Sequence, residues 1–366
     1  MKNTFGSSVA VTLIGESHGA MIGAVLDGMA PGIPVDEEYL RHRMLLRQGP
    51  AALSTKRREP DEVRIVSGVK DGVTTGTPIT LLIENTDTRS KDYASMAVLP
   101  RPGHADYTAV CKYHGFADER GGGHFSGRIT AGLVAAGAIA LMALARRGIQ
   151  VGTHIASSAG IHDRDFLDPS IDIALLESRD FGVLDTKAGD AMRAAIEAAR
   201  AEGDSIGGVL ETAVTGLPAG VGEPWFDTLE GVLAHGLFSI PAIKGVEFGD
   251  GFRLAEMKGS EANDPFRMKN GTVVTATNRA GGILGGISTG MPLIIRSAVK
   301  PTPSIYREQK TVDLSRREDA TLTVAGRHDP AIVHRARPVV DSVVALALCD
   351  LLALRYGTDW IRGEQK

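Results

Sequence analysis

Cysteine is nearly absent from this chain of 366 residues, which contains only Cys111 and Cys349. The two lie far apart, so the sequence has no CxxC pair, no zinc-site spacing and no disulfide framework. No signal-peptide pattern follows Met1-Lys2-Asn3-Thr4. These absences predict a reducing, cytoplasmic setting.

An excess of positive charge is missing too. Lys and Arg total 40 against 44 Asp and Glu, a formal net charge of −4, so no overall basic field predicts binding to nucleic acid. The apolar run between Arg128 and Arg146 has 17 residues, at the short limit of the roughly 17–25 that a bilayer requires. Many of them are Ala or Gly, which favours the buried centre of a globular protein over a membrane span.

Several catalytic motifs are also absent. No histidine is followed by Glu, which excludes an HExxH zinc site, and no Walker-type phosphate loop occurs. No metal site is predicted. The Gly-x-Ser-x-Gly pattern is centred on Ser17, Ser205 and Ser288, but none of the three has the strand before it and the helix after it that a serine hydrolase needs. The run 281–286 lacks the spacing of a dinucleotide fingerprint.

Glycine, in contrast, is abundant, with 44 residues. Three are consecutive, Gly121 to Gly123, and run through Ser126 and Arg128 into the apolar segment 129–145. Ser126 is a predicted N-cap, and a helix that begins behind a glycine turn presents free N–H groups to an anion. A tight turn that packs a buried helix would leave the same pattern, so this stretch alone leaves both interpretations open.

The spacing of apolar residues predicts strands that arrive in pairs rather than alternating with helices, which indicates an α+β fold with antiparallel sheets. Predicted strands are 9–13, 21–26, 63–66, 79–83, 151–155, 209–215, 273–277 and 293–297. Predicted helices are 36–47, 129–145, 187–202, 227–238 and 338–355. Residues 85–127 and 163–186 are predicted to be irregular, and 85–127 is interpreted as a wall of the active site because long ordered loops are usually functional.

Cations stand beside the glycine turns at Arg47, Arg101, His104, Arg128, Lys300, Arg327 and His328. Because Arg pairs with phosphate and carboxylate in a bidentate way, the set predicts a small polyanionic ligand. Taken alone, each of these side chains is equally well interpreted as a solvated surface residue. His18, in a glycine-bracketed turn between two predicted strands, is either functional or a loop side chain bonded to Glu16 or water.

Six sequence blocks together resemble chorismate synthase in their residues and in their order. The resemblance extends from about residue 6 to 356. The blocks are Gly15–Gly19, Arg57–Asp61, Arg101–Tyr107, Gly281–Gly286, Lys300–Ser304 and Arg327–Pro330. The resemblance implies a lyase that converts 5-enolpyruvylshikimate 3-phosphate to chorismate and phosphate by 1,4-trans elimination, using reduced FMN without net redox change. It also implies a β-α-β sandwich with helices between antiparallel sheets, one domain over residues 1–366 and a homotetramer. Without a nicotinamide fingerprint, the reduced flavin is expected to come from an external source.

The resemblance also implies roles for individual residues. His18 would be the acid facing the departing phosphate, His104 would act near flavin N1, and Asp329 would hold the flavin N5 region while the C6 proton is removed. Substrate would be bound by Ser17, Arg47, Arg128 and Arg327. FMN would lie against Arg101, His124, Phe125, Ser126, Ala242, Gly285, Lys300, Pro301, Thr302, Pro303, Ser304 and Arg327.

The sequence departs from the usual motifs of the family in three places. His124-Phe125-Ser126-Gly127-Arg128 replaces a common Arg-Ser-Ser-Ala-Arg, no second arginine follows Arg47 in 49–53, and Pro241 stands where Asn is frequent. We expect His124 to replace part of the lost charge. Two other hypotheses are a flavin oxidoreductase with net redox chemistry and a non-catalytic binder of phosphate ligands. The first lacks a hydride-donor site, and the second has no use for His18, His104 and Asp329 together.

Overall fold

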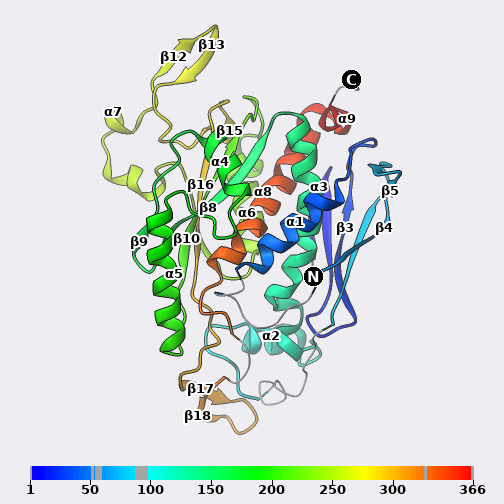
Figure 1. The fold of residues 1–366 in the computed structure, drawn as a ribbon, viewed down its shortest axis with the longest axis vertical. Helices are drawn as coiled ribbons and strands as arrows, with labels where there is room; N and C mark the ends of the chain where they lie inside the picture. The colour runs from blue at the N-terminus through cyan, green and yellow to red at the C-terminus, as the bar shows by residue number, and fades with distance from the viewer. Residues whose placement is uncertain (1, 51–52, 54–59, 87–97, 325–327, 364–366) are drawn as a thin grey trace.

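Two five-stranded antiparallel sheets face each other across a layer of helices in the computed structural model (Figure 1), which describes residues 2–50, 53, 60–86, 98–324 and 328–363. The first sheet has the order β1 (Thr4–Phe5), β2 (Ala10–Gly15), β3 (Met21–Asp27), β7 (Ile79–Glu84) and β4 (Val63–Ser67). The second has the order β11 (Ile243–Phe248), β16 (Leu293–Val299), β10 (Gly208–Thr215), β8 (Gln150–Ser158) and β9 (Ile161–His162).

Four helices fill the space between the sheets: α1 (Glu37–Gln48), α3 (Thr130–Arg146), α6 (Leu229–Ser239) and α8 (Val333–Tyr356). α3 packs on the first sheet and α8 on the second, and the two helices contact each other. On β8, Thr153 bonds to Asp341 of α8 while Gly152 faces Ile173 of α4 (Pro169–Glu177). Because neighbouring strand residues point to opposite faces, α4 covers the outer face of the second sheet, where α5 (Thr186–Ala201) lies beside β9.

The remaining elements are short. Helices α2 (Asp106–Tyr113), α7 (Gly259–Ala262) and α9 (Thr358–Arg362) lie at the periphery. Four hairpins pair β5 (Val69–Lys70) with β6 (Val73–Thr74), β12 (Phe266–Lys269) with β13 (Thr272–Thr275), β14 (Ile283–Leu284) with β15 (Ile287–Ser288), and β17 (Gln309–Asp313) with β18 (Glu318–Leu322).

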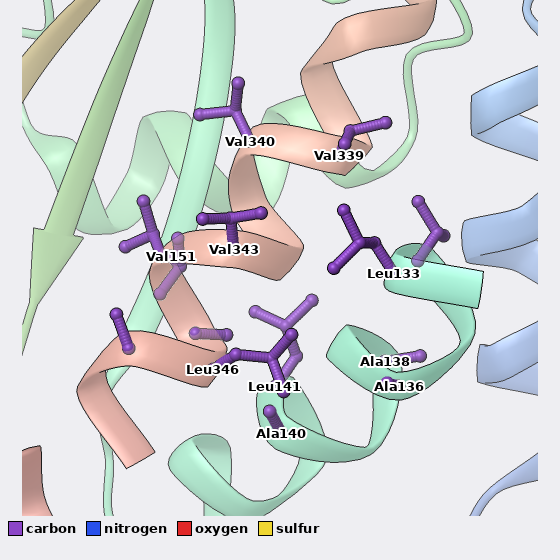
Figure 2. Close-up of a cluster of buried hydrophobic side chains, with 14 of the residues drawn as sticks. Leu133, Ala136, Ala138, Ala140, Leu141, Val151, Val339, Val340, Val343 and Leu346 are labelled. Carbon is purple, nitrogen blue, oxygen red and sulfur yellow. The ribbon is translucent and has the colours of Figure 1, made fainter. Parts of the chain in front are cut away.

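The small residues of α3 allow the layers to approach closely. A Cβ at Gly132 would lie 2.6 Å from the carbonyl oxygen of Gly23 in β3, and one at Gly137 would lie 2.1 Å from the Cβ of Ser342 in α8. Figure 2 shows the apolar side chains that meet around this crossing. Residues 127–146 are long and apolar enough to cross a membrane, but 89% of the apolar window is buried inside the protein, so the segment is the predicted core helix.

The C-terminal helix also holds the N-terminal segment in place. Asp350 of α8 is buried, and its carboxylate accepts hydrogen bonds from the backbone N–H groups of Ser7, Ser8 and Val9 at 3.0, 2.6 and 2.9 Å. Three N–H donors satisfy a buried carboxylate that would otherwise be costly to desolvate. The start of β2 is therefore fixed by a residue near the end of the chain.

The sandwich, its antiparallel sheets and the predicted strands and helices of the core are confirmed, and the following details were wrong. The segment 85–127 contains helix α2, and 163–186 contains α4, whose N-cap Asp168 and first residue Pro169 are a helix-start signal. α6 is capped by Thr228, one residue after the predicted Asp227. Pro338 does not begin α8 but lies inside it, because burial of the helix from Val333 onward outweighs the one backbone hydrogen bond that proline cannot make.

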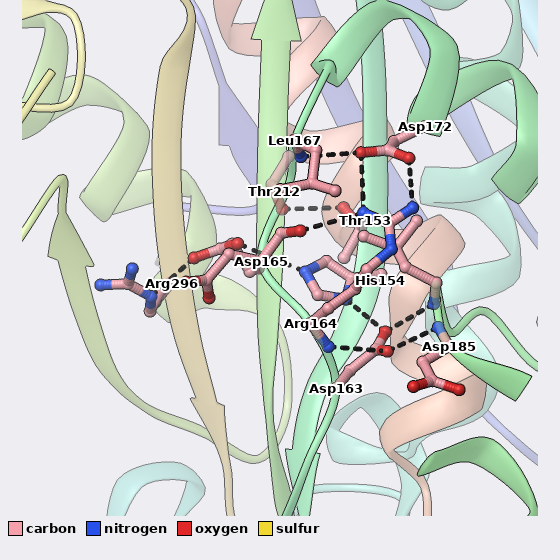
Figure 3. A network of polar contacts seen from close by, with 12 residues as sticks. Thr153, His154, Asp163, Arg164, Asp165, Leu167, Asp172, Asp185, Thr212 and Arg296 are labelled. Carbon is pink, nitrogen blue, oxygen red and sulfur yellow. Dashed lines mark hydrogen bonds and ion pairs between the residues drawn. The ribbon is translucent and has the colours of Figure 1, made fainter. Parts of the chain in front are cut away.

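A buried ionic network lies on the outer side of the second sheet (Figure 3). The imidazole of His154 is 2.8 Å from a carboxylate oxygen of Asp163 and 3.3 Å from one of Glu211, and Glu211 accepts a hydrogen bond from Arg296 at 2.7 Å. Burial alone would lower the pKa of His154, but the hydrogen bonds to Asp163 and Glu211 outweigh it and raise the pKa. The folded protein therefore binds the His154 proton more tightly than the unfolded chain does.

This network predicts a pH-dependent stability. The contribution of protonated His154 is fully present below the unfolded pKa of about 6.5 and is lost as the pH rises through the higher folded-state pKa. His154→Gln should lower the free energy of unfolding by about 1.5–3 kcal/mol at pH 5.5, as expected for charged hydrogen bonds, and by less at pH 9. Urea unfolding of both proteins at the two pH values measures the difference, and an equal loss at both would contradict the assignment.

Candidate active site

A cavity of about 1520 Å³ opens where the C-terminus of α1 meets the N-termini of α3 and α8. Its wall includes the turn before α2, the glycine stretch 121–127 and the segment 300–304. Helix N-termini carry partial positive charge, and the side chains of Arg47, Arg101, Arg128 and Lys300 line the same space. The cavity is therefore suited to anions.

The glycine stretch runs between two histidines. Gly121, Gly122 and Gly123 all have positive φ, at 62°, 83° and 54°. A Cβ at Gly121 would lie 2.0 Å from the ring of His18, and a Cβ at Gly122 would lie 3.3 Å from Cε1 of His104. Glycine is needed here both for the left-handed backbone and for the space that the imidazoles occupy.

His18 and Ser17 lie in the turn between β2 and β3. Both are buried, and both lie behind Gly121, which lines the cavity, rather than in the cavity wall itself. The backbone N–H of Ser17 donates to the carbonyl oxygen of Gly123 at 3.1 Å. The Ser17 hydroxyl, fully buried, has no hydrogen-bond partner among the described residues.

His104 is clamped by its neighbours in the turn before α2. Its Nδ1 lies 2.6 Å from Oδ1 of Asp106, and Arg101 donates to the same carboxylate from Nε at 2.8 Å and from Nη2 at 2.7 Å. Burial alone would raise the pKa of Asp106, but the hydrogen bonds from Arg101 and His104 hold it well below its usual range. Asp106 is therefore ionised.

Arg47 and Arg128 converge on one buried carboxylate. Asp61 accepts from Nη1 of Arg47 at 3.1 Å and from Nη1 of Arg128 in a shorter contact. Arg47 also donates to Thr130 Oγ1 and to the carbonyl oxygens of Gly127 and Arg128, at 3.1, 3.1 and 3.3 Å. Among the described residues, the two guanidinium groups therefore share one buried carboxylate.

Asp329 pairs with a cation of α8. Arg335 contacts the Asp329 carboxylate through Nη1, and its Nε donates to the backbone carbonyl of Arg47 at 3.1 Å. Both side chains line the cavity. Arg327 lies outside the described residues, as do residues 57–59 of the second matched block.

Lys300 and residues 302–304 form the part of the cavity wall next to Gly103. Lys300 donates from Nζ to the carbonyl oxygen of Gly103 at 3.0 Å, and the described residues include no carboxylate paired with it. Burial and the nearby charge of Lys244 lower the pKa of Lys300. Cavity-lining members of the predicted FMN set are Arg101, His124, Phe125, Ser126, Ala242, Lys300, Thr302, Pro303 and Ser304.

Two residues of the predicted FMN set are not brought to the cavity wall. Gly285 lies in the turn of the β14–β15 hairpin, and Gly286 beside it bonds to Leu229 at the start of α6. Pro301 belongs to the loop after Lys300 but does not line the cavity. Neither Gly285 nor Pro301 therefore lines the cavity of this chain.

The residues that replace the usual family wording make local contacts. His124 bonds through Nδ1 to the carbonyl oxygen of Gly15 at 2.9 Å, and its Nε2 lies 3.2 Å from Oδ1 of Asn3. Phe125 packs edge-on against Tyr113 of α2 at 6.0 Å between ring centroids. Ser126 accepts from the backbone N–H of Arg128 at 3.3 Å and caps the short 3-10 turn Gly127–Ile129 that leads into α3, whereas α3 itself begins at Thr130 without a side-chain cap, so the predicted N-cap of the helix was wrong.

Sequence reasoning missed the three residues that pair with the predicted groups: Asp61, Asp106 and Arg335. Asp61 and Asp106 stand inside two of the matched blocks, and a carboxylate among clustered cations was a usable signal. Arg335 had no such signal, because only the folding of α8 against the end of α1 brings it to Asp329.

Comparisons with known proteins agree with one another. A family model described as chorismate synthase matches residues 9–353. Curated relatives carrying that name are 48% identical in Thermococcus kodakarensis and 49% in Thermococcus gammatolerans, each over 96% of this chain and 97% of the relative. A third, from Methanosarcina acetivorans, is 45% identical over 97% of each chain. A crystal structure of chorismate synthase is similar with a TM-score of 0.76 and 28% identity, covering 97% of this chain and 94% of the other.

Proposed function

We propose, since the chain belongs to the chorismate synthase family, that the cavity lined by Arg47, Arg101, Arg128 and Lys300 is its active site. The enzyme is a lyase that converts 5-enolpyruvylshikimate 3-phosphate to chorismate and phosphate, the final step of the shikimate pathway. The observation that carries the assignment of the site is the packing of His18 and His104 against consecutive glycines at the edge of a cationic cavity.

The substrate carries a phosphate and two carboxylates, and the cluster around Asp61 suits such an anion. Asp61 holds Arg47 and Arg128 side by side. Charged hydrogen bonds from these groups, together with Ser17 and Arg327, would hold the phosphate and carboxylates. The Ser17 hydroxyl beside His18 has no hydrogen-bond partner among the described residues and would donate to the leaving phosphate.

Reduced FMN would lie against the part of the wall formed by Lys300 and residues 302–304. Lys300 has a positive charge with no carboxylate paired among the described residues, and the buried Thr302 hydroxyl beside it has no hydrogen-bond partner there. Such a pair is suited to the FMN phosphate, while His124, Phe125 and Ser126 would lie along the ring system. When bound, reduced FMN would supply transient electron density to the substrate and be regenerated unchanged.

The reaction breaks the C3–O bond and the C6–H bond and forms one new double bond. His18 would donate a proton to the departing phosphate, and His104 would exchange a proton at Nε2 on the flavin side. Asp329, held by Arg335, would lie on the C6 side, where the proton is removed. Positioned acid–base groups of this kind typically contribute about 10²–10⁴-fold.

An anaerobic assay tests the proposal. Purified protein with photoreduced FMN and 5-enolpyruvylshikimate 3-phosphate should form chorismate and release phosphate in equal amounts, without consuming the reduced flavin. Oxidised FMN with NADPH and no added reductase should give no turnover, because we propose an external source of reduced flavin. Stoichiometric oxidation of the flavin would instead favour an oxidoreductase.

Arg128→Ala should weaken substrate binding roughly tenfold to a hundredfold, since one charged hydrogen bond contributes about 1.5–3 kcal/mol. FMN affinity should change little, because the proposed FMN wall does not include Arg128. Isothermal titration with each ligand measures both affinities. Arg64→Ala, which removes an exposed arginine paired only with Glu84 among the described residues, is the control, and equal substrate affinity in the two variants would contradict the role of Arg128.

We further propose that residues 1–366 act as one domain, that the enzyme is a cytoplasmic homotetramer, and that it has neither a nucleic-acid nor a membrane partner. The support is the family resemblance, the net charge of −4 and the two unpaired cysteines. Light scattering of the purified protein tests the tetramer.

A further inference from the structure

Asp106 is a multiply bonded carboxylate in the turn that carries His104. Its Oδ2 accepts from the backbone N–H of Arg101 at 3.0 Å and from Nε at 2.8 Å, and its Oδ1 accepts from Nη2 at 2.7 Å. Its side chain is 14% exposed, and that of Arg101 is 6% exposed. As the first residue of α2, Asp106 has a fixed backbone. The carboxylate is thus held rigidly from three sides.

The remaining contact of Asp106 determines the tautomer of His104. Nδ1 of His104 lies 2.6 Å from Oδ1 of Asp106 and 3.0 Å from Nη2 of Arg101. An unprotonated Nδ1 would place two acceptors 2.6 Å apart. The carboxylate is ionised by its pairing with Arg101, so Nδ1 must carry the proton and donate it to Asp106. Arg101 then directs its Nη2 proton to Asp106 rather than to the imidazole.

This tautomer leaves one nitrogen for chemistry. With Nδ1 protonated, Nε2 is the nitrogen that can gain or lose a proton. A Cβ at Gly122 would lie 3.3 Å from Cε1 and 3.5 Å from Nε2 of His104, so the Cε1–Nε2 edge faces the glycine stretch. The absence of a side chain at Gly122 leaves that edge uncovered.

We propose that Asp106 is a positioning residue of the reaction, which fixes the Nδ1–H tautomer and the orientation of His104 so that Nε2 is the site of proton exchange. Arg101 saturates the carboxylate, so the proton on Nδ1 stays there and Asp106 does not become protonated during turnover. The inference rests on the proposed function, in which His104 acts on the bound ligands.

The first test is made on the unmodified protein. Nitrogen NMR of histidine-labelled enzyme, assigned with His104→Ala, should show the neutral His104 ring protonated at Nδ1. Asp106→Asn should shift the signal toward a mixture of tautomers. An Nε2–H tautomer in the unmodified protein would overturn the proposal, whether or not the variant folds.

The second test is kinetic and uses the holoenzyme with reduced FMN. Asp106→Asn should lower kcat by about 10²-fold or more and change KM by only a few-fold. His104→Ala and the double variant should lose the same rate, because the proposed effect of Asp106 on kcat is exerted through His104. Asp172→Asn, which alters another Arg-paired carboxylate that does not line the cavity, should retain full activity.

The outcomes separate the two hypotheses. Additive losses in the double variant would overturn the role of Asp106 in positioning His104. A fully active His104→Ala would instead refute the proposed role of His104, and with it the catalytic part of this proposal, while the NMR result would still establish whether Asp106 sets the tautomer.

Discussion

His18→Ala is expected to lower kcat by about 10²–10⁴-fold, the usual contribution of a general acid, without unfolding the protein. The imidazole is buried in a turn between two strands of the first sheet, and no other described histidine lies against Gly121. Without a proton donor, C–O cleavage at the phosphate should become the slow step. A substrate deuterated at C6 should then show a smaller kinetic isotope effect in this variant than in the unmodified enzyme.

His162→Ala provides the control, because His162 is an exposed histidine on β9, outside the cavity wall. It should keep full activity and the unmodified isotope effect. A His18→Ala enzyme with unchanged kcat, or with an isotope effect equal to that of the control, would show that His18 does not donate the proton.

Gly121→Ala is expected to reduce kcat by a comparable factor, although it removes no polar group. The added Cβ would lie 2.0 Å from the His18 ring and 3.0 Å from the Ser17 hydroxyl, so both side chains must move. A displacement of about 1 Å at a catalytic group can cost about 10²-fold. The positive φ of 62° adds backbone strain of about 1–2 kcal/mol. Steady-state kinetics and thermal unfolding measure the two effects.

Gly115→Ala separates strain from displacement. Gly115 has a similar φ of 80°, but a Cβ there meets nothing within 4 Å. It should therefore lose some stability and keep its activity. If Gly121→Ala lost no more activity than Gly115→Ala, the close packing of His18 against the glycine stretch would have no catalytic meaning.

The core of the fold was predictable because its signals are local. Alternating apolar residues predicted β2, β3 and β7, and Asp36 with the run after it predicted α1. Helix α2 was missed because polar and charged residues interrupt its apolar periodicity and it buries no residue fully, whereas α4 was missed although Asp168 and Pro169 mark its start. Pro338 led to a wrong prediction of where α8 begins. Helix-start rules describe isolated helices, whereas α8 is stabilised by burial along almost its whole length.

The site was predictable to a different extent. The cations and the glycines could be recognised in the sequence, and the resemblance to the family implied roles for individual residues among them. Their partners could not, because Asp61 meets Arg128 across 67 residues and Arg335 meets the end of α1 across 288. Pairings over such separations depend on the packing of α1, α3 and α8, which no local pattern encodes.

The bond between Asp350 and the residues before β2 has a consequence for biosynthesis. The backbone N–H of Val9 bonds to Asp350, 341 residues further along the chain. At a translation rate of about 5–20 residues per second, Asp350 is synthesised roughly 20–70 s after Val9. During this time the first sheet and α3 have been synthesised, but α8, against which α3 packs, has not. Until α8 has emerged, the face of α3 that packs against it lacks this cover, and α8 then completes the core.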